Sequence, residues 1–238
     1  MKITYCDNYE QMSQYAHDSI VSDLKTNPKQ LLCLATGNSP TGLYKTIAET
    51  YNIHPQYFKD FNIIKLDEWG GIDINDPSSC ETYLRDKILK PLDVSADRFI
   101  SFKSNTNAPE KECERIQKEL DEKGPIDICV LGIGVNGHIG FNEPAEALVA
   151  GCHIGQLAKT SMQHQMVNTI KIKPSYGLTL GMADILHSKK IILLITGSNK
   201  ETITEQLLNK NITTQLPASL LWLHANVECY IDLESVKK

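Results

Sequence analysis

The stretch 130–144 joins a glycine-rich turn to two side chains that can exchange protons. Its sequence is V-L-G-I-G-V-N-G-H-I-G-F-N-E-P, and it places His138 shortly before Glu143. A histidine has little apolar reason to lie in such a loop, and a nearby carboxylate can orient it and raise its basicity. The pair predicts a proton shuttle acting on a hydroxyl group. The alternative is a hydrogen bond that only shapes the loop.

Two acids, Asp67 and Glu68, directly follow the apolar run 61–66. A carboxylate at the end of a buried strand can remove a proton from carbon if partial burial raises its pKa. The alternative for this pair is a loop carboxylate or a helix cap. Trp69 then belongs either to the core or to the wall of a pocket.

Two further turns suit a phosphate. Thr36, Gly37, Asn38 and Ser39 lie between an apolar run and a helix that we expect to begin with Ser39 as N-cap and Pro40 in its first turn. Free amides at such a helix start bind anions.

The second turn, 196–200, reads T-G-S-N-K and places Lys200 where its cation can join the same phosphate. The alternatives are a plain strand–helix turn for the first stretch and a surface lysine for the second. Neither stretch is a Walker loop.

The glycines Gly132, Gly134 and Gly137 match the G-x-G-x-x-G pattern of dinucleotide-binding turns. The match is weak here, because the motif lies past the middle of the chain and N-E-P interrupts the helix that should follow. We therefore expect no nicotinamide cofactor. A serine hydrolase is not expected either, because the chain has no G-x-S-x-G elbow.

The composition describes an ordinary globular protein, with 238 residues, 41% hydrophobic and 22% charged. A formal net charge of −5 argues against a nucleic-acid-binding surface. No run of apolar residues is long enough for a transmembrane helix, and the first residues do not resemble a signal peptide. The seven scattered cysteines fit a reducing cytoplasm and argue against disulfides or a zinc site.

The elements that must position these residues alternate between short apolar runs and amphipathic stretches. We expect a single α/β domain over residues 1–238, with a mostly parallel sheet, Rossmann-like, and helices on both faces. The expected helices are 9–25, 41–50, 79–90, 109–123, 182–187, 198–208 and 220–224. The expected strands are 2–5, 31–35, 61–66, 99–102, 126–131, 191–196 and 227–231. Residues 174–181 form either a strand or a turn, and 147–172 are less regular.

With these residues identified, the chain resembles the glucosamine-6-phosphate deaminase/isomerase family over almost its whole length. The signatures are A-T-G-N-S-P-T-G-L-Y-K, K-L-D-E-W, L-G-I-G-V-N-G-H-I-G-F-N-E-P, I-T-G-S-N-K and P-A-S-L-L-W-L-H. The third is the most specific, because the related 6-phosphogluconolactonases lack the F-N-E-P that ends it. The stretches L-D-E-W, S-C-E-T-Y-L, G-C-H-I-G-Q-L and P-A-S-L-L-W-L-H are most similar to the galactosamine-6-phosphate branch.

The resemblance implies a fold like those of sugar-phosphate isomerases and CoA transferases. It also implies a reaction that opens the ring of a 2-amino-2-deoxyhexose 6-phosphate, moves a proton from C2 to C1 and releases ammonia. Asp67 would be the C2 base, His138 the ring-opening acid/base and Glu143 its support. Residues 36–39 and Lys200 would hold the phosphate. No metal or other cofactor is implied.

Three departures from the family pattern matter. Asn136 stands where many members carry an aspartate that completes a relay, so Glu143 must do more of that work. The family's phosphate-binding arginine is missing, and His164 or Gln165 is its stand-in. The basic residues of an allosteric site are absent from 146–156, so we expect no activation by an N-acetylated sugar phosphate. Family members range from monomers to hexamers, which leaves a homo-oligomer open.

The leading hypothesis is a galactosamine-6-phosphate deaminating isomerase that forms tagatose 6-phosphate. The nearest alternative is a glucosamine-6-phosphate deaminase that forms fructose 6-phosphate. More distant alternatives are a lactonase, which needs no C2 base, and a non-catalytic sugar-phosphate sensor.

Overall fold

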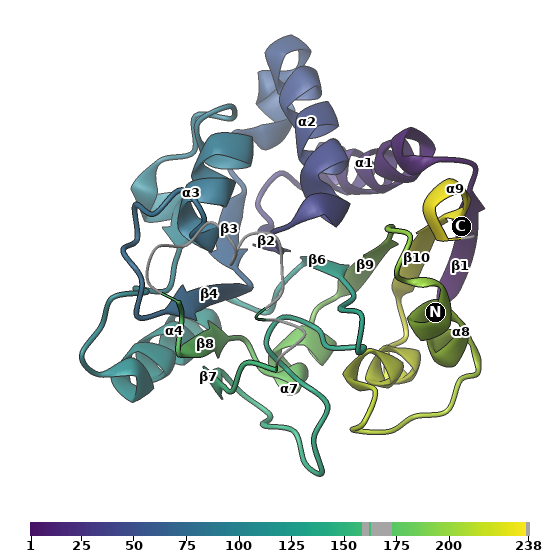
Figure 1. Ribbon diagram of the computed structural model, residues 1–238. Helices are drawn as coiled ribbons and strands as arrows, with labels where there is room; N and C mark the ends of the chain where they lie inside the picture. The colour runs from purple at the N-terminus through teal and green to yellow at the C-terminus, as the bar shows by residue number, and fades with distance from the viewer. Residues whose placement is uncertain (159–161, 163–172, 237–238) are drawn as a thin grey trace.

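The computed structural model describes residues 1–158, 162 and 173–236 of the chain. Its centre is a parallel sheet of seven strands in the order β1-β10-β9-β6-β2-β3-β5 (Figure 1). Their bounds are β1 Lys2–Cys6, β2 Leu31–Leu34, β3 Asn62–Lys65, β5 Phe99–Ile100, β6 Ile128–Gly132, β9 Lys190–Ile195 and β10 Val227–Asp232. The central strands read as continuous apolar runs because both of their faces are buried.

Helices cover both faces of this sheet, as expected (Figure 1). The α-helices are α1 Tyr9–Thr26, α2 Asn38–Ile53, α3 Cys80–Leu84, α4 Pro109–Lys123, α7 Met182–Leu186, α8 Glu201–Leu208 and α9 Leu233–Val236. Shorter or irregular turns are η1 Pro55–Phe58, η2 Arg85–Leu89, η3 Ala96–Arg98 and η4 Pro217–Leu223. Alternate residues of each strand join a core with α1 and α2 on one face and with α4, α7 and α8 on the other.

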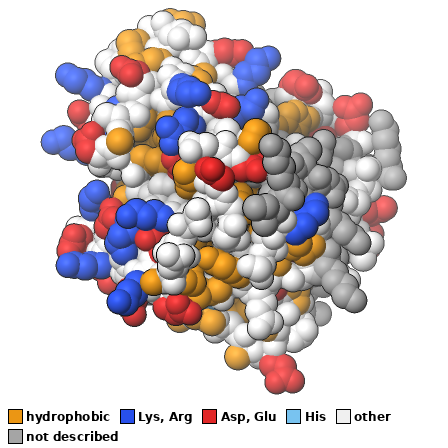
Figure 2. Space-filling model, turned by 60° about the vertical axis from the view of Figure 1, so that its left-hand side comes forward, with side chains coloured by type: hydrophobic (Ala, Val, Ile, Leu, Met, Phe, Trp, Pro, Cys, Tyr) orange, Lys and Arg blue, Asp and Glu red, His pale blue; other side chains and the backbone are white. Residues whose placement is uncertain are grey.

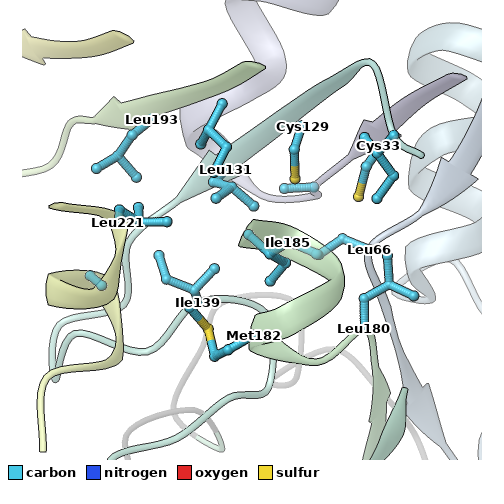
Figure 3. Close-up of a cluster of buried hydrophobic side chains, with 14 of the residues drawn as sticks. Cys33, Leu66, Cys129, Leu131, Ile139, Leu180, Met182, Ile185, Leu193 and Leu221 are labelled. Carbon is cyan, nitrogen blue, oxygen red and sulfur yellow. The ribbon is translucent and has the colours of Figure 1, made fainter. Parts of the chain in front are cut away.

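The second of these cores extends to the glycine-rich stretch. Figure 3 shows Cys33 of β2 and Leu131 of β6 on the side of the sheet that faces Ile185 of α7, and Leu193 of β9 above Leu221 of η4. Ile139, which directly follows His138, is fully buried in the same cluster. The loop that carries the candidate histidine is therefore anchored in the core by its own apolar residue.

A small antiparallel sheet in the order β4-β8-β7 lies beside the large one. Its strands are β4 Asp67–Gly70, β8 Tyr176–Thr179 and β7 His153–Gly155. Asp67 and Glu68 were expected to follow a strand that ends at residue 66, and no strand was predicted for them, but the backbone of β4 pairs with β8. Strand β7 was not anticipated in the irregular stretch 147–172.

Several helix bounds differ from expectation. Residues 220–224 were expected to be an α-helix, but Pro217–Leu223 forms the 3-10 helix η4. The segment 79–90 divides into α3 and the π-helical turn η2, although Ser79 caps it through a 2.9 Å hydrogen bond from the Thr82 amide. Helix α8 begins at Glu201 rather than at Ser198, because residues 197–200 form a turn closed by a 3.0 Å bond from Lys200 N to Gly197 O.

The chain order of the sheet reverses between β2 and β6. From β2 the chain moves outward through β3 to β5, and it then returns to the other side of β2 with β6, β9 and β10. Loops that leave neighbouring parallel strands in opposite directions open a crevice at their carboxyl ends. Here those loops are 36–39 after β2 and the glycine-rich stretch after β6.

The surface shows no dominant sign of charge in the view that brings α3 and α4 forward (Figure 2). Among the coloured residues, Lys and Arg side chains lie between Asp and Glu side chains, and no continuous basic stripe is seen on this face. Of the helices described, none combines the length and apolar character needed to cross a membrane.

Candidate active site

Four neighbouring strands deliver the candidate residues to one edge of the sheet. Strands β9, β6, β2 and β3 lie side by side and parallel, so their carboxyl ends face the same way. The segments that follow them carry Lys200, the stretch 130–144, the turn 36–39 and Asp67. Parallel topology thus brings together residues that are far apart in the sequence.

The histidine and glutamate of the glycine-rich stretch meet as the sequence predicts. His138 Nδ1 lies 3.2 Å from Glu143 Oε2, and both side chains are mostly shielded, at 21% and 12% exposed. Asn136 Nδ2 donates to the same glutamate oxygen at 2.8 Å. Its Oδ1 also accepts from the His138 amide at 3.3 Å. Asn136 therefore fixes both members of the pair without carrying a charge.

Glycine is required at Gly134 because the imidazole packs directly over it. A Cβ at Gly134 would lie 2.3–2.4 Å from ring atoms of His138. The backbone also closes on itself here, since Gly134 N donates to His138 O at 3.0 Å. Gly137 has φ of +85°, in the left-handed region that favours glycine. The glycines thus shape the space that holds the His138 imidazole, which we call the histidine seat.

Asp67 is a buried carboxyl, 9% exposed, at the start of β4. Burial, followed by the charge of Glu68, raises the pKa of Asp67 to about 7, against opposing effects of Lys65 and the Cys80 thiol. A carboxyl poised near neutral pH is suited to accept and return a proton. The glycine-rich loop comes close to it, because a Cβ at Gly140 would lie 3.5 Å from Asp67 Oδ2.

Glu68 has a structural role that the sequence left open between a loop acid and a cap. It is fully buried, and Oε1 accepts from the amide of Cys80 at 2.9 Å, while Oε2 accepts from the amide of Glu81 at 2.9 Å. Lys65 Nζ donates to Glu68 Oε2 at 2.6 Å and to Glu81 Oε2 at 3.2 Å. Burial disfavours this ammonium, but Glu68 and Glu81 outweigh it and raise the pKa of Lys65.

Cys80 is the residue of this region that sequence reasoning missed. Its thiol donates to Asp67 Oδ1 at 3.8 Å and accepts from the Thr36 hydroxyl at 3.4 Å. The thiol therefore links the turn after β2 to the carboxyl after β3. The sequence shows only that Cys80 follows Ser78 and Ser79 at the start of an expected helix. This position does not reveal which side chain the Cys80 thiol contacts.

The turn after β2 differs in one detail from expectation. Helix α2 begins at Asn38, and its N-cap is Gly37 with φ of +100°, so the prediction of Ser39 as N-cap was wrong. The Gly37 carbonyl is held by Tyr83 Oη at 2.7 Å and by Thr41 Oγ1 at 2.9 Å. The first amides of α2 have no acceptor within the helix and point out of its N-terminus. An anion is favoured at this position.

Lys200 lies next to the end of β6. Its ammonium donates to the carbonyl of Ile133 at 2.6 Å, and burial lowers the pKa of the lysine to about 8. On the other side of the same strand, a Cβ at Gly132 would lie 3.6 Å from Ser39 Oγ. Lys200 and Ser39 therefore flank the backbone of residues 132–133 from opposite sides.

The structure thus gathers Asp67, His138, Glu143 and Asn136, together with Lys200 and the turn 36–39, around one sheet edge. His164, and Gln165 beside it, lie outside the described residues. Within the described part of the chain, no group of three or more His, Cys, Asp or Glu side chains is placed to hold a metal ion.

The chain is similar to known proteins over almost its whole length. The family model for glucosamine-6-phosphate isomerases/6-phosphogluconolactonase matches residues 7–230. A protein of Escherichia coli (strain K12) named "Putative deaminase AgaI" is 38% identical over 226 residues, covering 95% of this chain and 90% of that protein. Glucosamine-6-phosphate deaminase 1 of Bacillus subtilis (strain 168) is 35% identical over 237 residues, covering 99% and 98%.

The solved structures give the same result at the level of the fold. A monomeric glucosamine-6-phosphate deaminase of the NagB superfamily superposes with a TM-score of 0.94 at 35% identity, covering 100% of this chain and 99% of that one. The 6-phosphogluconolactonase of Leishmania guyanensis reaches 0.78 at 19% identity, covering 98% and 96%. The second likeness concerns the fold alone.

Proposed function

Because the chain belongs to the family of glucosamine-6-phosphate isomerases and 6-phosphogluconolactonases, we propose that it is a deaminating isomerase of amino-sugar phosphates. The substrate class is a 2-amino-2-deoxyhexose 6-phosphate, and the products are a ketose 6-phosphate and ammonia. The seven free thiols fit an enzyme of the reducing cytoplasm.

One observation supports this proposal most strongly. Asp67 is buried, has a pKa of about 7 and lies beside the loop that carries the His138–Glu143 pair. A hydrolase acting on a lactone needs no base for a carbon acid, whereas the isomerisation does. A carboxyl that remains partly protonated at neutral pH can take a proton from C2 and deliver it to C1.

The remaining groups fit the other steps. Glu143 engages His138 Nδ1, so Nε2 is the nitrogen that we assign to proton exchange with the ring oxygen and the C1 hydroxyl during ring opening. Asp67 then takes the C2 proton and returns it to C1, which leaves an imine at C2. Addition of one water to this imine releases ammonia and leaves the ketone. Lys200 and the turn 36–39 would hold the 6-phosphate, and this remote binding fixes C1 and C2 against the reacting groups.

The galactosamine substrate is the finer part of the proposal. It rests on the stretches L-D-E-W, S-C-E-T-Y-L, G-C-H-I-G-Q-L and P-A-S-L-L-W-L-H, two of which contribute Asp67 and Cys80 to the site. A glucosamine substrate is the second candidate. The observation in its favour is that the named relatives at 34–35% identity are glucosamine-6-phosphate deaminases.

Ammonia release from each sugar phosphate tests both levels of the proposal. We expect turnover of both, with galactosamine 6-phosphate preferred. A tenfold preference for the glucosamine compound, which corresponds to about 1.4 kcal/mol in the transition state, would reverse the substrate choice. Asp67→Asn separates isomerase from lactonase, because retained turnover in this variant would exclude proton abstraction by Asp67. Binding without turnover of either compound would indicate a sensor.

A further inference from the structure

A groove of about 510 Å³ lies between α4 and β7. Its lining includes two of the seven cysteines, Cys113 of α4 and Cys152 just before β7. Of the candidate catalytic and phosphate-binding residues that the structure describes, none lines this groove. Its rim carries the acids Glu110, Glu114 and Asp121 and one base, Lys118.

The side chain of Gln117 ties α4 to the segment that carries Cys152. Gln117 Oε1 accepts from the amide of Cys152 at 2.8 Å. Cys113 lies one helical turn before Gln117 on the same face of α4, so its side chain faces the same segment. The approach is close enough to need glycine at Gly151, where a Cβ would lie 2.7 Å from Gln117 Oε1. The Cys113 and Cys152 thiols are close enough to shift each other's pKa, that of Cys113 downward and that of Cys152 upward.

A second pair of cysteines shows what makes this one different. Cys33 and Cys129 are opposite each other on β2 and β6, and both are fully buried in the core of the sheet. That pair is shielded from any reagent in solution. Cys113 and Cys152 line a groove that is open to solvent, and Cys152 is partly exposed. Of these two cysteine pairs, Cys113 and Cys152 are the pair whose thiols are both close together and reachable from solvent.

We propose that Cys113 and Cys152 form a reversible disulfide when the protein meets a hydroperoxide. This proposal is independent of the proposed deaminase activity. A thiolate is the reactive form of cysteine, and the hydrogen bond from Cys152 lowers the pKa of the Cys113 thiol, against burial and the neighbouring acids. We assign the attack to Cys113 and the resolving step to Cys152, and the disulfide formed is the same if the two roles are exchanged.

The oxidation proceeds in two balanced steps. The Cys113 sulfur attacks an oxygen of the hydroperoxide, the O–O bond breaks, and an alcohol or water leaves with Cys113 as a sulfenic acid. The Cys152 sulfur then attacks the Cys113 sulfur, the S–S bond forms, and the sulfenic oxygen leaves as water. Two thiols are oxidised and one hydroperoxide is reduced. The acidic rim favours a neutral peroxide over an anionic disulfide such as oxidised glutathione.

The crosslink would enclose the candidate active-site loop in a covalent ring. The chain between the two cysteines includes all of 130–144, and with it His138 and Glu143. Because both thiols line one groove and Gln117 already ties α4 to the Cys152 backbone, we expect the bond to form without moving the loop. It should restrict the unfolded chain and raise the melting temperature by roughly 10 °C, while leaving the activity within twofold.

The test is to treat the intact protein with hydrogen peroxide and count free thiols after denaturation. We expect a fall from seven to five, a Cys113–Cys152 crosslinked peptide in non-reducing mass mapping, and reversal of both by dithiothreitol. Oxidised glutathione at equal concentration should react more slowly.

Cys152→Ser, at a partly exposed position, is the decisive variant, and Cys113→Ser is its partner. Neither should gain thermal stability on peroxide treatment, and both should keep peptides of Cys33 and Cys129 in the thiol form. Seven surviving thiols, a crosslink between other cysteines, or an unchanged stabilisation in Cys152→Ser would overturn the proposal.

Discussion

Asn136 and His138 meet at a single carboxylate oxygen. Glu143 Oε2 accepts from Asn136 Nδ2 at 2.8 Å and lies 3.2 Å from His138 Nδ1. The uncharged amide of Asn136 thus gives the geometric support that a second acid in this loop could give only by adding a negative charge. It holds the glutamate toward the imidazole and leaves one negative charge in the loop instead of two.

Replacing Asn136 by alanine should weaken this arrangement. A hydrogen bond to a charged group contributes about 1.5 kcal/mol or more, so we expect kcat/KM for ammonia release to fall at least tenfold in Asn136→Ala. The neighbouring Val135→Ala, at an exposed side chain, is the matched control and should stay within twofold. Equal activity of the two variants would limit Asn136 to shaping the loop.

The raised pKa of Asp67 predicts an acid limb in the activity profile. Only the carboxylate can accept the C2 proton, so kcat/KM should rise with pH through about 7. Asp67→Asn should lose nearly all activity at every pH. A profile that is flat from pH 5 to 8 in the wild type would show that another group is the base.

The raised pKa of Asp67 also affects stability, which should fall with rising pH while activity rises. The pKa of Asp67 is higher in the folded chain than its ordinary value of 3.8, so the folded state binds this proton more tightly. Asp67 therefore favours folding at low pH, and this contribution is lost as the pH rises through about 7.

Asn cannot ionise, so Asp67→Asn should be more stable than the wild type at pH 8, by up to ~4 kcal/mol, with most of the gain gone at pH 5. Urea unfolding at the two pH values measures this difference. A variant that is less stable than the wild type at pH 8 would contradict it.

Lys200 should control the binding of the phosphate rather than the chemistry. Its ammonium is lost as the pH rises through about 8, so the KM for the sugar phosphate should increase above that pH. Lys200→Gln should raise KM at least tenfold at pH 7, since a charge-assisted contact contributes ~1.5–3 kcal/mol.

Lys189→Gln is the control for this experiment, because Lys189 pairs with Asp127 at the opposite end of the sheet. It should leave KM unchanged. If Lys200→Gln lowered kcat and left KM alone, Lys200 would have to be assigned to the chemical step.

Two glycines of the same loop allow a matched test of the histidine seat. In Gly134→Ala the new Cβ would overlap the His138 ring, so the imidazole must move away from its position beside Glu143. In Gly132→Ala the new Cβ would make an ordinary 3.6 Å contact with Ser39 Oγ. We expect Gly134→Ala to lose more than tenfold in kcat and Gly132→Ala to lose less than threefold. Thermal melts of both variants show whether the fold is kept. Equal losses of kcat in the two variants would contradict the claim that Gly134 leaves the space that the His138 ring needs.

The parts of the fold that the sequence predicts are those that local pattern determines. Strands β2, β6 and β9 are recognisable because burial on both faces makes every position apolar. Strand β4 is not, because Asp67 and Glu68 look like loop residues until Lys65 and the amides of α3 are known to satisfy Glu68. Its partners come from elsewhere in the chain, and no local rule describes them.

The candidate site shows the same division. His138 and Glu143 are close in the sequence, and their contact is predictable from the loop alone. Cys80 contacts Asp67 because the start of α3 packs against the start of β4. A cysteine does not by its residue type suggest a hydrogen bond to a catalytic carboxyl. The cap at Gly37 was missed because Ser39 and Pro40 imitate a helix start two residues further on.

The pairing of β1 with β10 has a consequence for the order in which this protein can fold. Strand β1 lies at an edge of the main sheet, and among the described strands it pairs there with β10, one of the last elements. During synthesis β1 must therefore wait, with its backbone unpaired, until almost the whole chain has left the ribosome. Final closure of the sheet is a post-translational event, and a stalled chain that lacks β10 would present an open strand edge to its neighbours.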